Sequence, residues 1–440
     1  MATLAADTGT LRWRDDNGFN IGSVTTLNAT VNGVTSRSAD LSASNGAMTQ
    51  DSDAALQVAG TLNLSGGLFE LGGVNNNVNS LTANGVSLSL RDDDGFNVAG
   101  ISMTNTACLF SNGNVTQSAA IVANAIGLGG NGIFNLNHAN NDVNTLAASG
   151  QGLVYRDADG FDIGTVTPPA GAPKSGISVV DSVVLTGGGA VTQAAAISAN
   201  GLALNGAADD FTLNLAGNTV ATVAGNASRI AYSQSGSLAI GTVTGADASV
   251  TNGISVGDQV TLQTMDLLAS LTLNSAVVAQ GAGFAAVLAT QRDVINNVGA
   301  SALQTPNGNW ALYANNPVTS VFNGLTAPTN VFENSIATLP PASLPAGANA
   351  IVLQSLKPAV PPTSSEPPPQ NPPAADFSGA GSQMLQLDAA VWAIAAIRAI
   401  VIIGGDNYCR HDACRVNSSA PIQACFPMDQ HPSACWRRCI

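Results

Sequence analysis

The chain contains the stretch RDDNGFNI at residues 14–21 and returns to it three times. The copies read RDDDGFNV at 91–98, RDADGFDI at 156–163 and, more altered, YSQSGSLAI at 232–240. Their central glycines are Gly18, Gly95, Gly160 and Gly236. A phrase that returns at intervals of roughly 70 residues indicates a repeat architecture, and the unequal intervals indicate that it tolerates insertions.

Two further phrases recur in fixed order with the first. One is GAMTQ at 46–50, GNVTQ at 113–117 and GAVTQ at 189–193, and the other is NNVNSL at 76–81, NDVNTL at 141–146 and NTVATV at 218–223. Between them the sequence alternates apolar and polar residues in short runs closed by Gly, Asn or Asp, as in TLNLSGGLFELGG at 61–73. This pattern predicts short strands joined by tight turns.

The repeat predicts an all-β fold, a parallel β-solenoid. A unit of this size makes about three coils of roughly 20–25 residues, with strands of successive coils stacked in parallel. A narrow lumen favours small apolar side chains, and Gly supplies the backbone conformations that sharp corners require. A β-sandwich also has short strands, but it does not predict one set of phrases returning every ~70 residues.

The composition agrees with a long, thin core and narrows the function. Hydrophobic residues make up 45% of the 440 residues, but aromatic residues make up 5% and charged residues 10%. Ordinary globular proteins have about 25% charged residues, so an ordinary soluble enzyme is not indicated. The 28 acidic residues outnumber the 14 basic ones and give a net charge of −14. This balance argues against nucleic-acid binding, which needs clustered Lys and Arg.

The sequence divides into four parts. Residues 1–283 hold the β-solenoid repeats, and 284–357 are expected to form terminal coils and a cap, because Trp310, Tyr313 and Phe322 place large rings there. Residues 358–375 form a Pro-rich linker, and 376–440 contain an apolar segment and a Cys-rich, partly helical tail. Arg398 interrupts the apolar segment, which favours an amphipathic or buried helix over a membrane span.

The N-terminal residues match the interior of a repeat. ATLAADTG at 2–9 corresponds to NTLAASG at 144–150, and Met1–Asp7 does not read as a signal peptide. We therefore expect this chain to be the C-terminal piece of a longer protein, or its start to be misassigned.

The cysteines are concentrated at the other end. Cys108 stands alone, whereas the other five lie close together near the C-terminus: Cys409, Cys414, Cys425, Cys435 and Cys439. Disulfides in an oxidising compartment, a zinc site and a tail without a fold are the three interpretations of this cluster.

The order of the phrases over residues 1–355 resembles that of filamentous haemagglutinin-like adhesins, the large exoproteins of two-partner secretion in Gram-negative bacteria. The resemblance lies in VTQSAA at 115–120, NDVNTLAA at 141–148 and DGFDIGTV at 159–166. It implies a right-handed parallel β-helix that is secreted or held at the cell surface. It further implies a filamentous adhesin fragment, a rigid repeat spacer and attachment surface without catalysis. The implied partners are an outer-membrane transporter of the parent protein and glycans or proteins on a host or neighbouring cell.

The Asp-rich corners are the candidate sites. Close-set oxygen ligands around a glycine turn suit Ca²⁺, and they are offered by two sets: Asp92 and Asp94, and Asp157, Asp159 and Asp162. The other interpretation is an Asx corner, in which the carboxylates accept backbone N–H bonds and the following Phe enters the lumen.

A β-helical polysaccharide lyase or hydrolase is the alternative function. Such chemistry needs carboxylates clustered with Lys, Arg or His, and His138 is the one histidine before the tail. For attachment, the loop Thr165–Ser175, with Pro168, Pro169 and Pro173, is the insertion expected to be most exposed.

Overall fold

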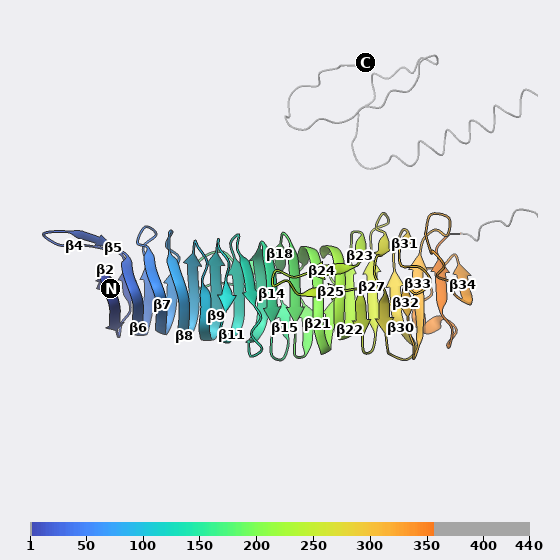
Figure 1. Cartoon of the computed structure of the whole chain (residues 1–440), viewed down its shortest axis with the longest axis horizontal. Helices are drawn as coiled ribbons and strands as arrows, with labels where there is room; N and C mark the ends of the chain where they lie inside the picture. The colour runs from blue at the N-terminus through green and yellow to red at the C-terminus, as the bar shows by residue number, and fades with distance from the viewer. Residues whose placement is uncertain (1, 356–440) are drawn as a thin grey trace, which may run out of the picture. The chain divides into compact units, whose positions relative to one another are not determined.

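The computed structural model describes residues 2–355, which belong to one compact unit and form a parallel β-solenoid (Figure 1). The predicted fold class is therefore confirmed. The predicted Pro-rich linker at 358–375, the apolar segment and the tail cysteines lie outside the described residues. Within 2–355 no helix has the length and apolar character needed to cross a bilayer.

The first half of the solenoid carries the strands β1 (Ala2–Leu4), β2 (Ala6–Asp15), β3 (Phe19–Ile21), β4 (Ser23–Thr25), β5 (Thr30–Asn32), β6 (Val34–Gln50), β7 (Leu56–Leu71), β8 (Asn77–Asp92), β9 (Asn97–Ser111), β10 (Thr116–Gln117), β11 (Ile121–Gly129), β12 (Ile133–Leu136), β13 (Asp142–Gly150), β14 (Gly152–Arg156), β15 (Phe161–Ile163), β16 (Thr165–Val166) and β17 (Lys174–Ser175).

The second half carries β18 (Ile177–Val179), β19 (Ser182–Thr186), β20 (Ala190–Gln193), β21 (Ile197–Leu213), β22 (Thr219–Gln234), β23 (Leu238–Ile240), β24 (Thr242–Thr244), β25 (Val250–Asn252), β26 (Ile254–Val256), β27 (Val260–Thr264), β28 (Leu271–Leu273), β29 (Val277–Ala279), β30 (Phe284–Ala289), β31 (Val294–Asn296), β32 (Leu303–Gln304), β33 (Asn309–Ala314), β34 (Thr329–Phe332), the 3-10 turn η1 (Pro341–Ser343) and β35 (Ala350–Leu353).

The register of the strands gives the length of a coil. Phe69 lies opposite Leu88, and Leu88 lies opposite Ala107, so these three residues hold equivalent places in successive coils. The step from Leu81 to Val98 is shorter than these. Several coils are thus somewhat shorter than the expected length of roughly 20–25 residues, because their corners turn without extra loop residues.

The core is one continuous apolar column inside the coils. It begins at Leu4 and continues to Leu353, and Phe69, Leu88 and Leu109 in its interior are fully buried. Alternate residues of each strand point into the lumen, which is why the sequence alternates with period two. Each fully buried Leu or Phe contributes about 2 kcal/mol of hydrophobic stabilisation.

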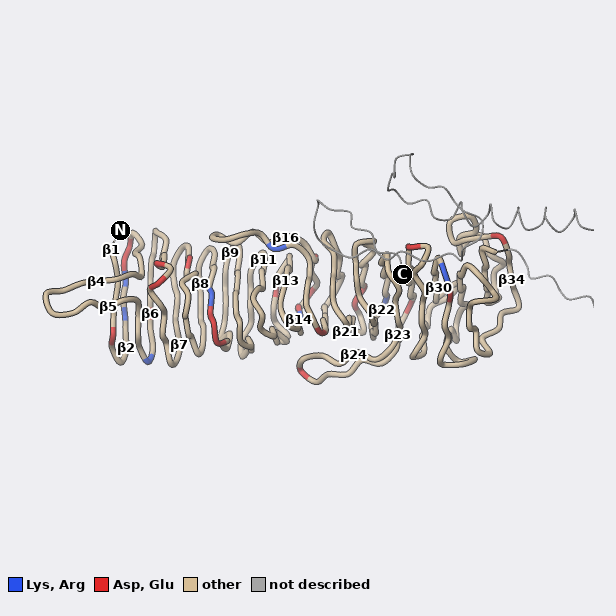
Figure 2. Tube along the Cα trace, turned by 90° about the horizontal axis from the view of Figure 1, so that it is seen from above, with Lys and Arg blue, Asp and Glu red and all other residues tan. Residues whose placement is uncertain are grey.

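Three antiparallel hairpins interrupt the coils: β4–β5, β16–β17 and β24–β25. Each lengthens its coil, so that Ala148 lies opposite Ile177, on the far side of β16–β17 in the sequence. In the view of Figure 2, β16 and β24 lie along opposite sides of the solenoid. The hairpin β16–β17 is the predicted exposed loop Thr165–Ser175; its tip at 170–173 is exposed, whereas Val166 is only 1% exposed. The most exposed tip is instead on β4–β5, where Leu27 is fully exposed.

The C-terminal coils continue the same stack. β30 pairs in parallel with β27 and β33, and β33 pairs with β35. Trp310 and Tyr313 are buried, and the Tyr313 hydroxyl donates a hydrogen bond of 2.9 Å to the Leu339 carbonyl. Leu344 packs with Tyr313 in a small separate apolar cluster, so residues after β33 cover the outer face of β30, β33 and β35.

Candidate functional sites at the repeat corners

The corner aspartate of the second copy is bound by the backbone. Asp92 is fully buried, and its carboxylate accepts the N–H groups of Val78, Asp94 and Gly95 at 2.7, 3.1 and 2.7 Å. Burial raises the pKa of Asp92, and the backbone N–H donors oppose that rise. Phe96 enters the lumen and is 4% exposed. This geometry is that of the Asx corner.

The third copy repeats the arrangement with an added hydroxyl. Asp157 accepts the N–H groups of Val143 and Gly160 at 3.1 and 3.2 Å and the Tyr155 hydroxyl at 2.8 Å. In the fourth copy Gln234 takes the same place. Its Oε1 accepts the Val220 N–H at 2.9 Å and the Tyr232 hydroxyl at 2.8 Å; its Nε2 donates to the Gly236 and Ser237 carbonyls. A neutral amide can therefore replace the carboxylate, because the role of the group is to bind the backbone.

Two other carboxylates of the calcium hypothesis, those of Asp94 and Asp162, also bind protein groups. Asp94 accepts an amide N–H of Asn77 at 2.7 Å, and Asp162 accepts the Thr192 hydroxyl at 2.8 Å. The Asp159 backbone N–H donates to Asp157. Within 2–355 no group of three or more His, Cys, Asp or Glu side chains is placed to hold a metal ion. The structure therefore gives these residues a corner geometry, and calcium binding stays a prediction.

The second and third repeated phrases meet in space. Asn141, from NDVNTL, is fully buried; its Oδ1 accepts the Ile121 N–H at 2.9 Å, and its Nδ2 donates to the Leu136 and Arg156 carbonyls at 3.1 and 2.9 Å. Gln117, from GNVTQ, donates to the same Oδ1 at 2.5 Å. The equivalent pairs are Gln50 with Asn76 and Gln193 with Asn218. Each pair ties three neighbouring coils together, a role that the sequence alone did not reveal.

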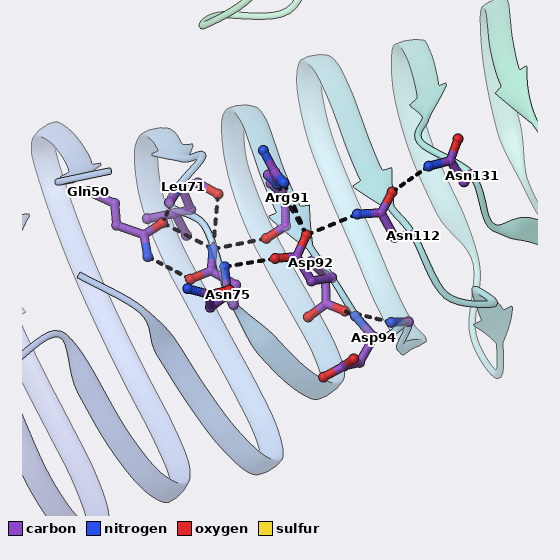
Figure 3. Close-up of polar contacts among 12 residues, drawn as sticks. Gln50, Leu71, Asn75, Arg91, Asp92, Asp94, Asn112 and Asn131 are labelled. Carbon is purple, nitrogen blue, oxygen red and sulfur yellow. Dashed lines mark hydrogen bonds and ion pairs between the residues drawn. The ribbon is translucent and has the colours of Figure 1, made fainter. Parts of the chain in front are cut away.

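An exposed polar ladder runs beside the Asp92 corner (Figure 3). Asn131 donates to Asn112 at 3.2 Å, Asn112 donates to Asp93 at 3.1 Å, and Arg91 forms an ion pair with Asp93 at 3.2 Å. Identical positions in stacked coils lie one strand spacing apart, so short polar side chains bond from coil to coil. The ladder contributes little energy because exposed pairs compete with water.

The histidine of the enzyme alternative lies in a loop between β12 and β13. His138 accepts the Asn140 N–H on its Nδ1 at 3.2 Å, and its own backbone N–H donates to Gln117 at 3.1 Å. The hydrogen bonds of this side chain are local ones that shape the loop. They join it to no carboxylate among residues 2–355.

The buried carboxylates give the protein a pH-dependent stability. Burial raises the pKa of Asp157 and of Asp209 to about 6 each. In the unfolded chain the pKa of Asp is about 4. Between about pH 4 and 6 the folded state therefore binds more protons than the unfolded state. The free energy of unfolding therefore falls as the pH rises through this window, and we expect a higher guanidinium midpoint at pH 5 than at pH 7.5.

Asp209→Asn is the control for this prediction. The Asp209 carboxylate accepts the Gly187 N–H at 2.8 Å, which an amide oxygen can also do. We expect the variant to lose part of the difference between the two pH values. A midpoint that is insensitive to pH in the parent protein, or a pH dependence unchanged by the substitution, would contradict the assignment.

A shallow groove of about 430 Å³ lies beside the hairpin β24–β25. Its lining includes the polar residues Asp181, Ser182, Asn200, Thr222 and Thr244. No sequence pattern predicted this groove, because it brings together coils and a hairpin that are far apart in the chain.

Comparison of the chain with protein-family models, with curated proteins and with solved structures finds no match.

Proposed function

We propose that this chain is part of a filamentous adhesin of the two-partner secretion type, acting without catalysis as a rigid spacer and attachment surface. The observation that carries the proposal is that residues of the repeated phrases hold neighbouring coils together. Asp92, Asp157 and Asn141 bind backbone groups of neighbouring coils and so serve the continuity of the rod. Such a rod suits a protein that is secreted or displayed at the surface of a Gram-negative cell, with an outer-membrane transporter as its partner.

The attachment role is supported by the groove beside β24–β25. Hydroxyl and amide groups such as those of Asn200 and Thr222 are donors and acceptors without net charge. They suit the hydroxyl groups of glycans on a host or neighbouring cell, which carry many hydrogen-bonding positions.

The test is binding of the full chain to an array of immobilised glycans. We expect the double variant Asn200→Ala, Thr222→Ala to bind about thirtyfold more weakly, since each of the two lost hydrogen bonds is worth about 1 kcal/mol. The control is the double variant Asn112→Ala, Asn131→Ala on the exposed ladder, which is expected to bind like the parent. Absence of binding by the parent chain to any glycan or cell surface would contradict the attachment role. Shortening of a polysaccharide during incubation would instead support the lyase or hydrolase alternative.

A further inference from the structure

The three hairpins leave the solenoid in the same way. In each, one glycine N–H donates to the coil before it: Gly22 to Leu4, Gly164 to Leu146 and Gly241 to Val223, at 3.0, 3.1 and 3.2 Å. In each, a second glycine closes the hairpin with a positive φ: Gly33 at 72°, Gly176 at 69° and Gly253 at 65°. The valine two residues after the first glycine is therefore equivalent in all three: Val24, Val166 and Val243.

The hairpin β16–β17 folds back over the outer face of the coils that precede it. Val166 is buried against Cys108 and Ala147, which belong to β9 and β13. Between them, a Cβ on Gly127 would lie 3.0 Å from the Cys108 sulfur and 3.2 Å from Val166. The hairpin therefore needs a row of small residues. Near its tip, the Ala170 carbonyl accepts the Ser89 hydroxyl of β8 at 3.4 Å.

The hairpin β24–β25 does the same on its own row. Val243 is 3% exposed and packs with Val154, Val184, Ala203 and Ala224, one from each of four successive coils. The Thr244 carbonyl accepts the Ser182 hydroxyl at 2.8 Å. Two of the three hairpins thus bury their valine on small side chains of preceding coils.

The hairpin β4–β5 has the same construction and points the same way, beyond β1 and β2 (Figure 1). Within residues 2–355, β1 pairs with β3 and β2 pairs with β6, so their other edges face no coil. Val24 is half-buried and Leu27 at the tip is fully exposed. Val24 is thus equivalent to Val166 and Val243, but within residues 2–355 no preceding coil presents a row of small side chains to it.

We propose that β4–β5 is a docking arm for a further stack of β-solenoid coils of this same repeat. Those coils pair in parallel with β1 and β2 and present a row of Ala, Gly, Cys or Val to Val24. This row of small residues is inferred from the surfaces that the hairpins β16–β17 and β24–β25 cover. The proposal does not depend on any attachment activity. A second copy joined head to tail is not favoured as the occupant, because at the far end β34 pairs with β35, and Phe322 and Phe332 pack against the column (Figure 1).

The first test uses the chain as it is. Val166→Ser removes a buried side chain and is expected to lower the melting temperature by roughly 4 °C or more. Val24→Ser is expected to lower it by less than about 1 °C, because its row is missing. An equal loss in both variants would overturn the proposal, since Val24 would then already have its partners.

The second test supplies the row. Residues 58–143 are repeated ahead of Ala2 of the full chain, so that the new junction matches the natural one between Val143 and Asn144. In this extended chain Val24→Ser is expected to cost as much as Val166→Ser, and cleavage by chymotrypsin after Leu27 is expected to slow at least tenfold. Hydrogen exchange of the β2 amides reports whether the added coils stack. If the added coils stack but Val24→Ser still leaves the melting temperature unchanged, the proposal is overturned. It is also overturned if the added coils fail to protect the β2 amides from exchange. Filaments of the parent chain that Val24→Ser disperses would also overturn it, in favour of a second copy.

Discussion

Asn141→Ala is expected to lower the free energy of unfolding by about 4 kcal/mol or more, because it leaves the Ile121 N–H and the Leu136 and Arg156 carbonyls without their partner in the interior. A buried polar group left without a hydrogen bond costs about 1–3 kcal/mol, and here three are affected at once. Guanidinium denaturation followed by circular dichroism measures the loss.

The matched control is Asn144→Ala, three residues away on β13, the strand that begins directly after Asn141. Asn144 is exposed and its amide donates to Asn124 at 3.0 Å, a contact between two exposed side chains. We expect a change within about 0.5 kcal/mol, as for most surface substitutions. Because a solenoid is stabilised coil by coil, hydrogen exchange should show the effect of Asn141→Ala concentrated in β11, β12 and β14. Equal effects of the two substitutions would contradict the role of the Asn141 network.

The fold could be predicted because two sequence signals indicate it: the alternation of apolar and polar residues within strands, and the repetition of the same phrases along the chain. Alternation such as that around Phe69 and Leu71 sets the inward face of each strand. The return of one phrase every ~70 residues then requires that equivalent strands have equivalent neighbours. Neither signal depends on which coil pairs with which.

The sites were less predictable because their partners are distant in the sequence. Gln117 and Asn141 are 24 residues apart, and only the register places them side by side. The phrases showed that both residues matter without showing that they touch. The burial of Val166 was missed for the same reason, since the row that receives it is spread over three coils.

The repeated phrases also explain one another at the corners, where glycines of neighbouring coils stack. Gly95 of the first phrase has φ of 92°, a conformation that L side chains rarely adopt. The second phrase contributes Gly113 at this corner. A Cβ atom on Gly113 would lie only 1.8 Å from the Asp94 carbonyl oxygen. The same close approach recurs at Gly46 with the Asn17 carbonyl, at 2.0 Å, and at Gly189 with the Asp159 carbonyl, at 1.9 Å.

Gly113→Ala is therefore expected to destabilise the protein by about 3 kcal/mol or more, because the coils must separate at the corner to admit the methyl group. The control is Gly72→Ala, where a Cβ would have no atom within 4 Å and φ is not positive. This control is expected to be neutral or slightly stabilising, since Ala restricts the unfolded chain more than Gly. Denaturation midpoints of the two variants measure the difference. If Gly113→Ala were as stable as Gly72→Ala, the stacked glycines would not be what holds the first and second phrases in fixed order.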